Sequence, residues 1–253
     1  MSDFALEVIG LHKNFGALEV AHNIDFTLKR GARHALIGPN GAGKTTFINL
    51  ITGVLAPSSG QIILNGQDIT GLGEAERSRC GLARTFQINQ LFRGLTVLEN
   101  VVLAIAERQG IASSMFRPLS SYSEVTDEAM DLLGNFELDE DALRRIDELP
   151  YGRQRLVEIV IALGQRPRVL LLDEPAAGMT AEERARLASA LRGLAGRMSL
   201  IVVEHDMQFI RDIATEITVF HRGQVFIEGD VAEIMAHSEV QEIYLGKEAD
   251  GAA

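Results

Sequence analysis

The chain has 253 residues, of which 46% are hydrophobic and 23% charged, and its formal net charge is −11 at pH 7. At roughly 150 residues per domain, this length predicts one large domain or a core with an inserted subdomain, and the composition excludes a disordered chain. The acidic balance argues against non-specific binding to nucleic acid or to anionic membranes, and the single cysteine excludes an internal disulfide.

The N-terminal part is predicted to hold a mostly antiparallel set of strands and one helix. Residues 22–28 alternate between apolar and polar side chains, which is typical of a half-buried strand. The apolar run 35–37 predicts a further strand, and residues 44–52 predict a helix. Residues 61–64 and the turn dipeptide Asn65-Gly66 predict the second half of the antiparallel patch.

The middle of the chain predicts helices without strands. A helical pattern covers residues 96–108, a serine-rich segment over 110–125 predicts a long loop, and residues 127–133 predict a second amphipathic helix. Apolar runs such as 101–106 are much shorter than the ~20 residues that span a membrane. We therefore expect an all-helical insertion between two halves of a sheet, and a membrane role only through a partner protein.

The C-terminal part alternates helices with strands. The predicted strands cover residues 169–172, 200–203 and 217–220. A helix is expected to begin at Thr180, which is spaced from Glu183 as in a capping box. Strands alternating with helices predict a parallel α/β sheet, and short helical patterning continues into the tail.

A phosphate-loop pattern, G-x-x-x-x-G-K-[ST], occupies residues 38–45, between a predicted strand and a predicted helix. Its glycines let the backbone N–H groups of residues 40–46 turn inward around phosphates, and the helix N-terminus adds partial positive charge. Lys44 is placed to bridge the β- and γ-phosphates, and the Thr45 hydroxyl to bind Mg²⁺. The sequence therefore predicts a nucleoside triphosphate site. Its expected ligands are Gly38, Asn40, Gly41, Ala42, Gly43, Lys44, Thr45 and Thr46.

Two carboxylates, Asp173 and Glu174, follow the apolar run of the predicted strand 169–172. An apolar run without alternation suits a central parallel strand, whose carboxyl end faces the ligand in open α/β sheets. Asp173 is therefore expected to hold Mg²⁺ through water, and Glu174 to act as the general base on the attacking water.

Four further segments stand in order around these two patterns. They are Lys13-Asn14-Phe15-Gly16, Arg84-Thr85-Phe86-Gln87, Leu149-Pro150-Tyr151-Gly152-Arg153-Gln154-Arg155 and Ile201-Val202-Val203-Glu204-His205-Asp206-Met207. With them, essentially the whole chain resembles the nucleotide-binding subunits of ATP-binding-cassette (ABC) transporters. The resemblance implies an ATPase coupled to transport, with ATP and Mg²⁺ as ligands.

The family's fold is the corresponding expectation. It is an α/β P-loop NTPase cassette with a RecA-like parallel-sheet core, an N-terminal antiparallel β patch and an inserted α-helical subdomain. On this chain we expect a single domain, with its core at about 1–87 and 156–230, the helical subdomain at about 88–155 and a C-terminal helical tail at about 231–253.

The resemblance also implies roles for residues of the outer segments. Phe15 corresponds to the aromatic platform for adenine, with Val20 near it, and a flat aromatic face suits a purine ring. Gln87 corresponds to the glutamine that contacts Mg²⁺ or the attacking water, on a loop that also touches the transmembrane permease. His205 corresponds to the switch histidine, which contacts the γ-phosphate.

The signature segment departs from the family pattern Leu-Ser-Gly-Gly-Gln. Pro150 stands where the serine hydroxyl meets the γ-phosphate of the opposite subunit, and proline lacks both hydroxyl and N–H. Tyr151, Gly152 and Arg153 are the remaining expected contacts with that nucleotide. Thr180 replaces the aspartate that follows the acidic pair in the common pattern, which puts its cross-interface role in doubt.

These departures, with Ile243-Tyr244-Leu245-Gly246 near the C-terminus, are similar to one subfamily: ATPase subunits of bacterial importers for branched-chain amino acids or related small amino acids and amides. The similarity implies a second ATPase subunit (hetero- or homodimer, with a heterodimer expected), transmembrane permease subunits, indirectly a solute-binding protein, and no nucleic acid. The expected location is peripheral, on the cytoplasmic side of the inner membrane. Alternatives are the ATPase of lipopolysaccharide export and a regulatory cassette with little hydrolysis.

Overall fold

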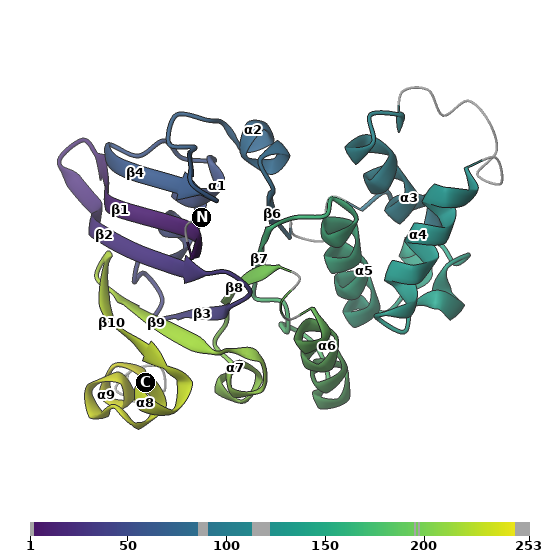
Figure 1. Ribbon diagram of the computed structural model, residues 1–253. Coiled ribbons are helices and arrows are strands. Elements are labelled where there is room, and N and C mark those ends of the chain that lie inside the picture. The colour runs from purple at the N-terminus through teal and green to yellow at the C-terminus, as the bar shows by residue number, and fades with distance from the viewer. Residues whose placement is uncertain (1–2, 86–90, 113–121, 195, 197, 246–253) are drawn as a thin grey trace.

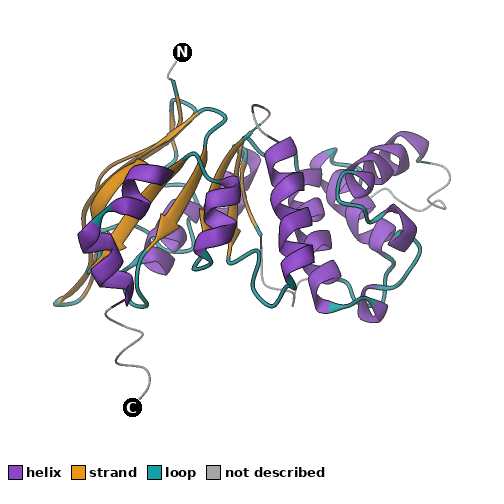
Figure 2. Cartoon of the chain, turned by 90° about the horizontal axis from the view of Figure 1, so that it is seen from below, coloured by secondary structure: helices purple, strands orange, loops and turns teal. Residues whose placement is uncertain are grey.

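The computed structural model describes residues 3–85, 91–112, 122–194, 196 and 198–245. Within these residues the chain forms two sheets and a separate group of helices (Figure 1). Figure 2 shows the strands gathered at one end of the molecule and a purely helical group at the other. The predicted α/β class, with an antiparallel patch and a helical insertion, is confirmed.

The smaller sheet is antiparallel, with strand order β2–β1–β4–β5 in the described chain. Its strands are β1 (Phe4–Phe15), β2 (Leu18–Lys29), β4 (Ser59–Leu64) and β5 (Gln67–Asp68). The predicted strands 22–28 and 61–64 lie within β2 and β4, but the sequence pattern did not predict β1. Its pairing with β2 is interrupted by register shifts, and such bulges break the period-2 alternation that marks a strand in the sequence.

The larger sheet has the strand order β10–β9–β3–β8–β7–β6 in the described chain, and β10 alone runs antiparallel to its neighbour. Its strands are β3 (Arg33–Ile37), β6 (Leu82–Arg84), β7 (Val169–Asp173), β8 (Ser199–Val203), β9 (Glu216–His221) and β10 (Gln224–Asp230). The predicted strands at 35–37, 169–172, 200–203 and 217–220 are confirmed. Because β3, β7 and β8 are parallel neighbours, the loops that follow them meet at one edge of the sheet.

The helices cover the larger sheet and form the insertion. They are α1 (Lys44–Thr52), α2 (Glu74–Arg79), α3 (Val97–Arg108), α4 (Ser123–Gly134), α5 (Tyr151–Gly164), α6 (Ala181–Gly193), α7 (Met207–Ile213), α8 (Val231–Ala236) and α9 (Ser238–Leu245). The helix predicted over 127–133 begins four residues earlier, so the predicted loop over 110–125 ends before Ser123. Among the described residues, no helix is both long and apolar enough to cross a membrane.

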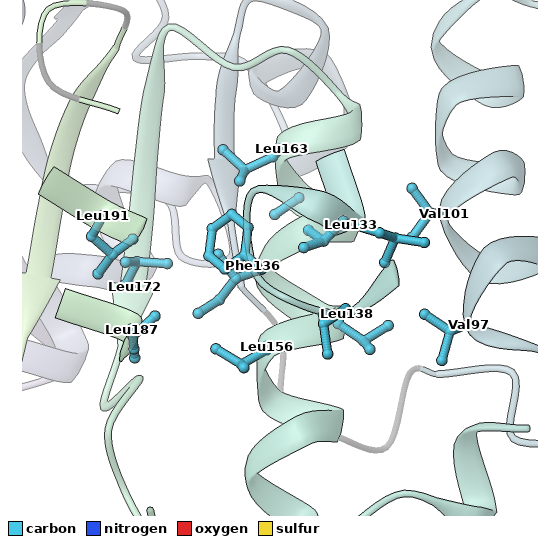
Figure 3. Packing of buried hydrophobic residues seen from close by; sticks show 14 of the residues in the cluster. Val97, Val101, Leu133, Phe136, Leu138, Leu156, Leu163, Leu172, Leu187 and Leu191 are labelled. Atoms are coloured by element: carbon cyan, nitrogen blue, oxygen red, sulfur yellow. The ribbon is translucent and has the colours of Figure 1, made fainter. Parts of the chain in front are cut away.

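One hydrophobic core joins the helical group to the larger sheet. Leu156 of α5 lies between Val97 of α3 on one side and Leu172 of β7 on the other (Figure 3). The subdomain boundary expected between residues 155 and 156 therefore falls inside α5, and this helix is shared by both parts. The tail packs on the other end of the sheet, where Ile234 of α8 and Val240 of α9 are buried beside β9.

A buried histidine in the larger sheet makes stability depend on pH. The Nε2 atom of His34 lies 2.7 Å from Thr218 Oγ1, and its Nδ1 has no hydrogen-bond partner in the described residues. Burial lowers the pKa of His34 from 6.5 to about 4, against the opposing charge of Glu216. The unfolded chain therefore binds this proton more readily than the folded chain between those two pH values.

We expect the free energy of unfolding to lose about 3 kcal/mol through His34 as the pH falls from 6.5 to 4, and to keep this contribution above 6.5. Denaturant unfolding of the wild type and His34→Gln across pH 4–7 measures it. The difference in unfolding free energy between the two should shrink toward acid, and a difference that stays constant contradicts the expectation.

Candidate functional site: a phosphate loop facing two carboxylates and a histidine

The phosphate loop joins β3 to α1 and is shaped by glycines with positive φ. Gly38 has φ 148°, and a Cβ there would lie 2.3 Å from the backbone oxygen of Phe220. Gly43 has φ 102°, and its Cβ would lie 3.0 Å from Gly223 Cα. Only glycine fits both the backbone conformation and the close approach of the β9–β10 turn. The loop is therefore held against the sheet end in one compact form.

Lys44 begins α1 and is almost fully buried, with 8% of its surface exposed. Its Nζ donates hydrogen bonds to the backbone oxygens of Gly38, at 2.5 Å, and Pro39, at 3.1 Å. The lysine thus folds back over the loop, and no acidic residue lies in the first turn of α1. An ammonium group at a helix N-terminus whose own first turn carries no carboxylate forms a site suited to a phosphate group.

A cavity of about 420 Å³ lies in front of the loop and joins most of the predicted site residues. Its lining combines residues of the phosphate loop with three residues from the ends of β7 and β8: Asn40, Gly41, Ala42, Gly43, Lys44, Thr45 and Thr46 with Asp173, Glu174 and His205. Val20 of β2 lines it as well, together with Glu19, His22 and Arg222, which the sequence did not single out. Segments far apart in the chain therefore meet around one polar cavity.

Asp173 ends β7 and is held by an arginine that the sequence did not assign. Arg84 Nη2 donates to Asp173 Oδ2 at 2.8 Å, and Arg84 Nη1 donates to Asn49 Oδ1 at 2.9 Å. Because β6 and β7 are parallel neighbours, the ends of the two strands bring these side chains together. The order of strands in the sheet would be needed to predict this pair.

Glu174 follows directly and adopts a left-handed backbone conformation, φ 48°, which is uncommon for a residue other than glycine. Its N–H donates to the backbone oxygen of Val203 at 2.9 Å. Its Oε1 lies 3.1 Å from His205 Nε2, in the loop after β8. Such strain at a cavity of this kind is typical of functional residues. The bond to β8 and the histidine together aim the carboxylate into the cavity.

Glu204 connects the two loops that carry Glu174 and His205. It is buried, and its carboxylate accepts hydrogen bonds from the N–H of Ala176, at 2.8 Å, and of His205, at 3.0 Å. Burial raises the pKa of Glu204, while these backbone donors oppose the rise. The sequence pattern placed Glu204 beside His205 and gave it no role, because its partner Ala176 lies 28 residues away.

The signature residues lie outside this cavity, at the start of α5. Tyr151 is 53% exposed, and a Cβ on Gly178 would lie 3.0 Å from its ring. A Cβ on Gly152 would lie 2.5 Å from Glu183 Oε1, so a larger residue there would displace the end of that side chain. Arg153 is held within the helical group, where its Nη1 donates to Asp141 Oδ2 at 2.9 Å.

Three other predicted residues are placed as follows. Thr180 caps α6, its Oγ1 accepting from Glu183 N at 3.3 Å, so the predicted capping box is confirmed. Phe15, at the end of β1, is 52% exposed, and Lys13 Nζ lies 5.0 Å from its ring centroid; it is not part of the cavity lining. Gln87 lies outside the described residues.

Comparison with known proteins identifies the family. Residues 21–177 match the family model "ABC transporter". The chain is 36% identical over 256 residues to the high-affinity branched-chain amino acid transport ATP-binding protein LivG of Escherichia coli (strain K12), covering 98% of this chain and all of that one. It is 34% identical, with the same coverage, to the corresponding protein BraF of Pseudomonas aeruginosa.

A sugar-transport protein and a solved structure are also similar. The ribose import ATP-binding protein RbsA 2 of Rhizobium etli is 34% identical over 98% of this chain, which spans 49% of that protein. The ADP conformation of an ATP-binding cassette of an ABC transporter has a TM-score of 0.84 at 29% identity, covering 97% of this chain and 100% of that one. The phosphate loop and the two carboxylates form a site suited to ATP, in agreement with these similarities. The chain therefore belongs to the ABC transporter family, as an ATP-binding and ATP-hydrolysing subunit.

Proposed function

We propose that this chain is the subunit that energises an importer for branched-chain amino acids or related small amino acids and amides. The observation that carries the energetic part is the cavity that joins Lys44 to Glu174 and His205. The full-length similarity to LivG and BraF supports the solute class. The similarity to a ribose import protein makes a sugar importer the second candidate.

ATP enters with its phosphates over the phosphate loop. The Nζ atom of Lys44 exchanges its hydrogen bonds to the backbone oxygens of Gly38 and Pro39 for hydrogen bonds to the β- and γ-phosphate oxygens. The N-terminus of α1 stabilises the negative charge of these oxygens. Val20 of β2 lines the cavity, and Phe15 of β1 pairs with Leu18 of the same strand, so these two side chains are the proposed contacts of the nucleoside, with Phe15 as the platform for adenine.

The oxygen donors of the cavity fit Mg²⁺. The hydroxyl of Thr45 and the carboxylate of Asp173 line the same cavity, and hydroxyl and carboxylate oxygens suit this hard cation. Arg84 contacts Asp173 Oδ2, and Oδ1 takes no hydrogen bond within the described residues. Thr45, Asp173 and Gln87 are the proposed ligands. When bound, the ion neutralises charge on the phosphate oxygens.

Glu174 acts as the general base. Its carboxylate lines the phosphate cavity and accepts a proton from the attacking water, while His205, 3.1 Å away, holds it in position and contacts the γ-phosphate. Glu204 keeps the two loops at a fixed spacing, so that base and histidine move together.

A second cassette completes the site. Tyr151, Gly152 and Arg153 lie outside this chain's own cavity, which supports a head-to-tail dimer in which they face the partner's ATP. ATP then closes the dimer by bridging two surfaces, and hydrolysis reopens it. The segment that carries Gln87 is the proposed contact with the permease, so the subunit works on the cytoplasmic side of the membrane, with a solute-binding protein delivering the cargo.

Purification from membranes under mild detergent tests this assembly. A tagged chain should retain two permease subunits and a second cassette, and the reconstituted complex should transport leucine rather than ribose. Recovery of the chain without a permease contradicts the proposal. If the complex transports ribose and not leucine, the energising role stands and the proposed solute class is wrong.

Restoring the signature hydroxyl tests the unequal sites. With Glu174→Gln in this chain, the remaining phosphate release belongs to the partner's site. Adding Pro150→Ser supplies a donor for that site's γ-phosphate and should raise this release by roughly ten- to a hundredfold. Pro150→Ala, which removes the ring without adding a hydroxyl, is the matched control. Equal rates for the serine and alanine variants contradict the asymmetry.

A further inference from the structure

Three residues that line the nucleotide cavity have no role in the binding of phosphates or in hydrolysis as described so far: Glu19, His22 and Arg222. The positive charge of Arg222 suits a cavity that receives phosphates, whereas the negative charge of Glu19 opposes them. A carboxylate only accepts hydrogen bonds, so it cannot bind phosphate oxygens, which are acceptors too. Glu19 therefore suits a part of the nucleotide that is uncharged and donates hydrogen bonds.

The position of Glu19 points to the sugar. In the hairpin of β1 and β2, Phe15 pairs with Leu18, which directly precedes Glu19 in the chain. On the side of the phosphate loop, a Cβ on Gly43 would lie 3.6 Å from the backbone oxygen of Val20, which directly follows Glu19. Glu19 thus lies between the proposed adenine platform and the phosphate loop. The ribose is the part of ATP that joins the base to the α-phosphate.

Two histidines hold the carboxylate of Glu19. His12 Nδ1 lies 3.1 Å from Glu19 Oε1, and His22 Nδ1 lies 3.2 Å from Glu19 Oε2. His22 is itself tied to the phosphate loop, because its N–H donates to Gly223 O at 2.8 Å and the N–H of Gly223 donates to Ala42 O at 2.9 Å. The side chain of Glu19 is 41% exposed, and each carboxylate oxygen has a second lone pair for a ligand. The carboxylate is thus an acceptor held in place before a ligand arrives.

We propose that Glu19 accepts hydrogen bonds from the 2′- and 3′-hydroxyls of the ribose of ATP, so that the chain selects ribonucleotides over deoxyribonucleotides. The two hydroxyls are neighbouring uncharged donors, and the two oxygens of one carboxylate can accept from both. Glu19 is therefore a specificity-determining residue, held by His12 and His22, and takes no part in hydrolysis. The inference rests on the proposed function, because it needs ATP with its adenine at Phe15.

Isothermal titration calorimetry of the full-length chain with Mg²⁺ and ATP, 2′-deoxyATP or 3′-deoxyATP tests the inference. Glu174→Gln is present in every sample, so that the nucleotides stay intact. The chain with Glu19 should bind ATP about fivefold more tightly than at least one deoxy analogue, the usual size of one charge-assisted hydrogen bond at an exposed site. Glu19→Ala should bind ATP and that analogue with equal affinity.

Glu140→Ala, which removes an exposed carboxylate outside the nucleotide cavity, is the matched control and should keep the fivefold preference. Thermal unfolding of each chain reports its folding. Equal affinities for ATP and both analogues in the chain with Glu19 overturn the inference, and so does a preference that persists in Glu19→Ala. If Glu19→Ala weakens the binding of all three nucleotides by one factor, Glu19 serves the hairpin alone and the inference is also wrong.

The two proposals fail differently. If the chain with Glu19 binds none of the three nucleotides, the energising role fails before any comparison of sugars is made. Phe15→Ala checks the place of the adenine and should weaken the binding of all three nucleotides alike. If ATP binds and Glu19→Ala leaves the preference unchanged, the energising role stands and only the contact with the ribose is wrong.

Discussion

Replacing Glu174 by Gln is expected to leave ATP binding intact and to lower turnover of the assembled transporter by a factor on the order of 10² to 10⁴, the usual contribution of a general base. The amide cannot accept the proton of the attacking water. Glutamine keeps the length of the side chain and a hydrogen bond to His205, whose Nε2 lies 3.1 Å from Glu174 Oε1 in the wild type. Steady-state phosphate release, with equilibrium binding of ATP measured in parallel, separates chemistry from affinity.

The matched control for this variant is Glu140→Gln, which makes the same chemical change at an exposed position outside the nucleotide cavity. Its turnover should equal that of the wild type. Hydrolysis near the wild-type rate in Glu174→Gln removes this residue from the role of base. A loss of ATP affinity alongside the loss of turnover would show that the substitution had displaced the backbone around residue 174. The lower turnover could then not be assigned to the missing proton acceptor alone.

Replacing Lys44 by Met should weaken ATP binding by about 10²-fold, because two charge-assisted hydrogen bonds to phosphate are lost. Methionine retains most of the apolar stem that is buried against the loop, so the fold is expected to survive. Equilibrium titration with a fluorescent ATP analogue measures the affinity, and thermal unfolding in the absence of nucleotide checks the fold.

Lys29→Met is the control for that experiment. Lys29, the exposed last residue of β2, pairs with Glu216 of β9 and does not line the nucleotide cavity. Its replacement should leave ATP affinity unchanged. Equal affinities in the wild type and Lys44→Met would contradict the assignment of this lysine to the phosphates.

Local patterns predicted the parts of the site that lie on single segments. The phosphate loop and the acidic end of β7 each combine an apolar strand with the polar residues that follow it, so sequence order alone places their chemistry. The same holds for Thr180, whose partner Glu183 is one helical turn away. Elements with regular periodicity, such as β2 and α3, were predicted for the same reason.

Contacts between distant segments were not predicted. Arg84 meets Asp173 only because β6 and β7 are neighbours, and Glu204 finds its donor on the loop after another strand. Arg155 and Glu158 of α5 pair at helical spacing, but the hydrogen bond from Arg155 to the carbonyl of Asp173 depends on how α5 packs on β7. These contacts depend on the order of the strands and on helix packing, which a single sequence does not specify.

The central claim is that hydrolysis in this cavity drives uptake of a branched-chain amino acid. Leucine accumulation in proteoliposomes that contain the purified complex, with ATP supplied on the cassette side, tests it most directly. The wild-type complex should accumulate leucine only with ATP, and the complex with Glu174→Gln should lose this accumulation in proportion to its hydrolysis. Equal accumulation by both complexes would contradict the claim.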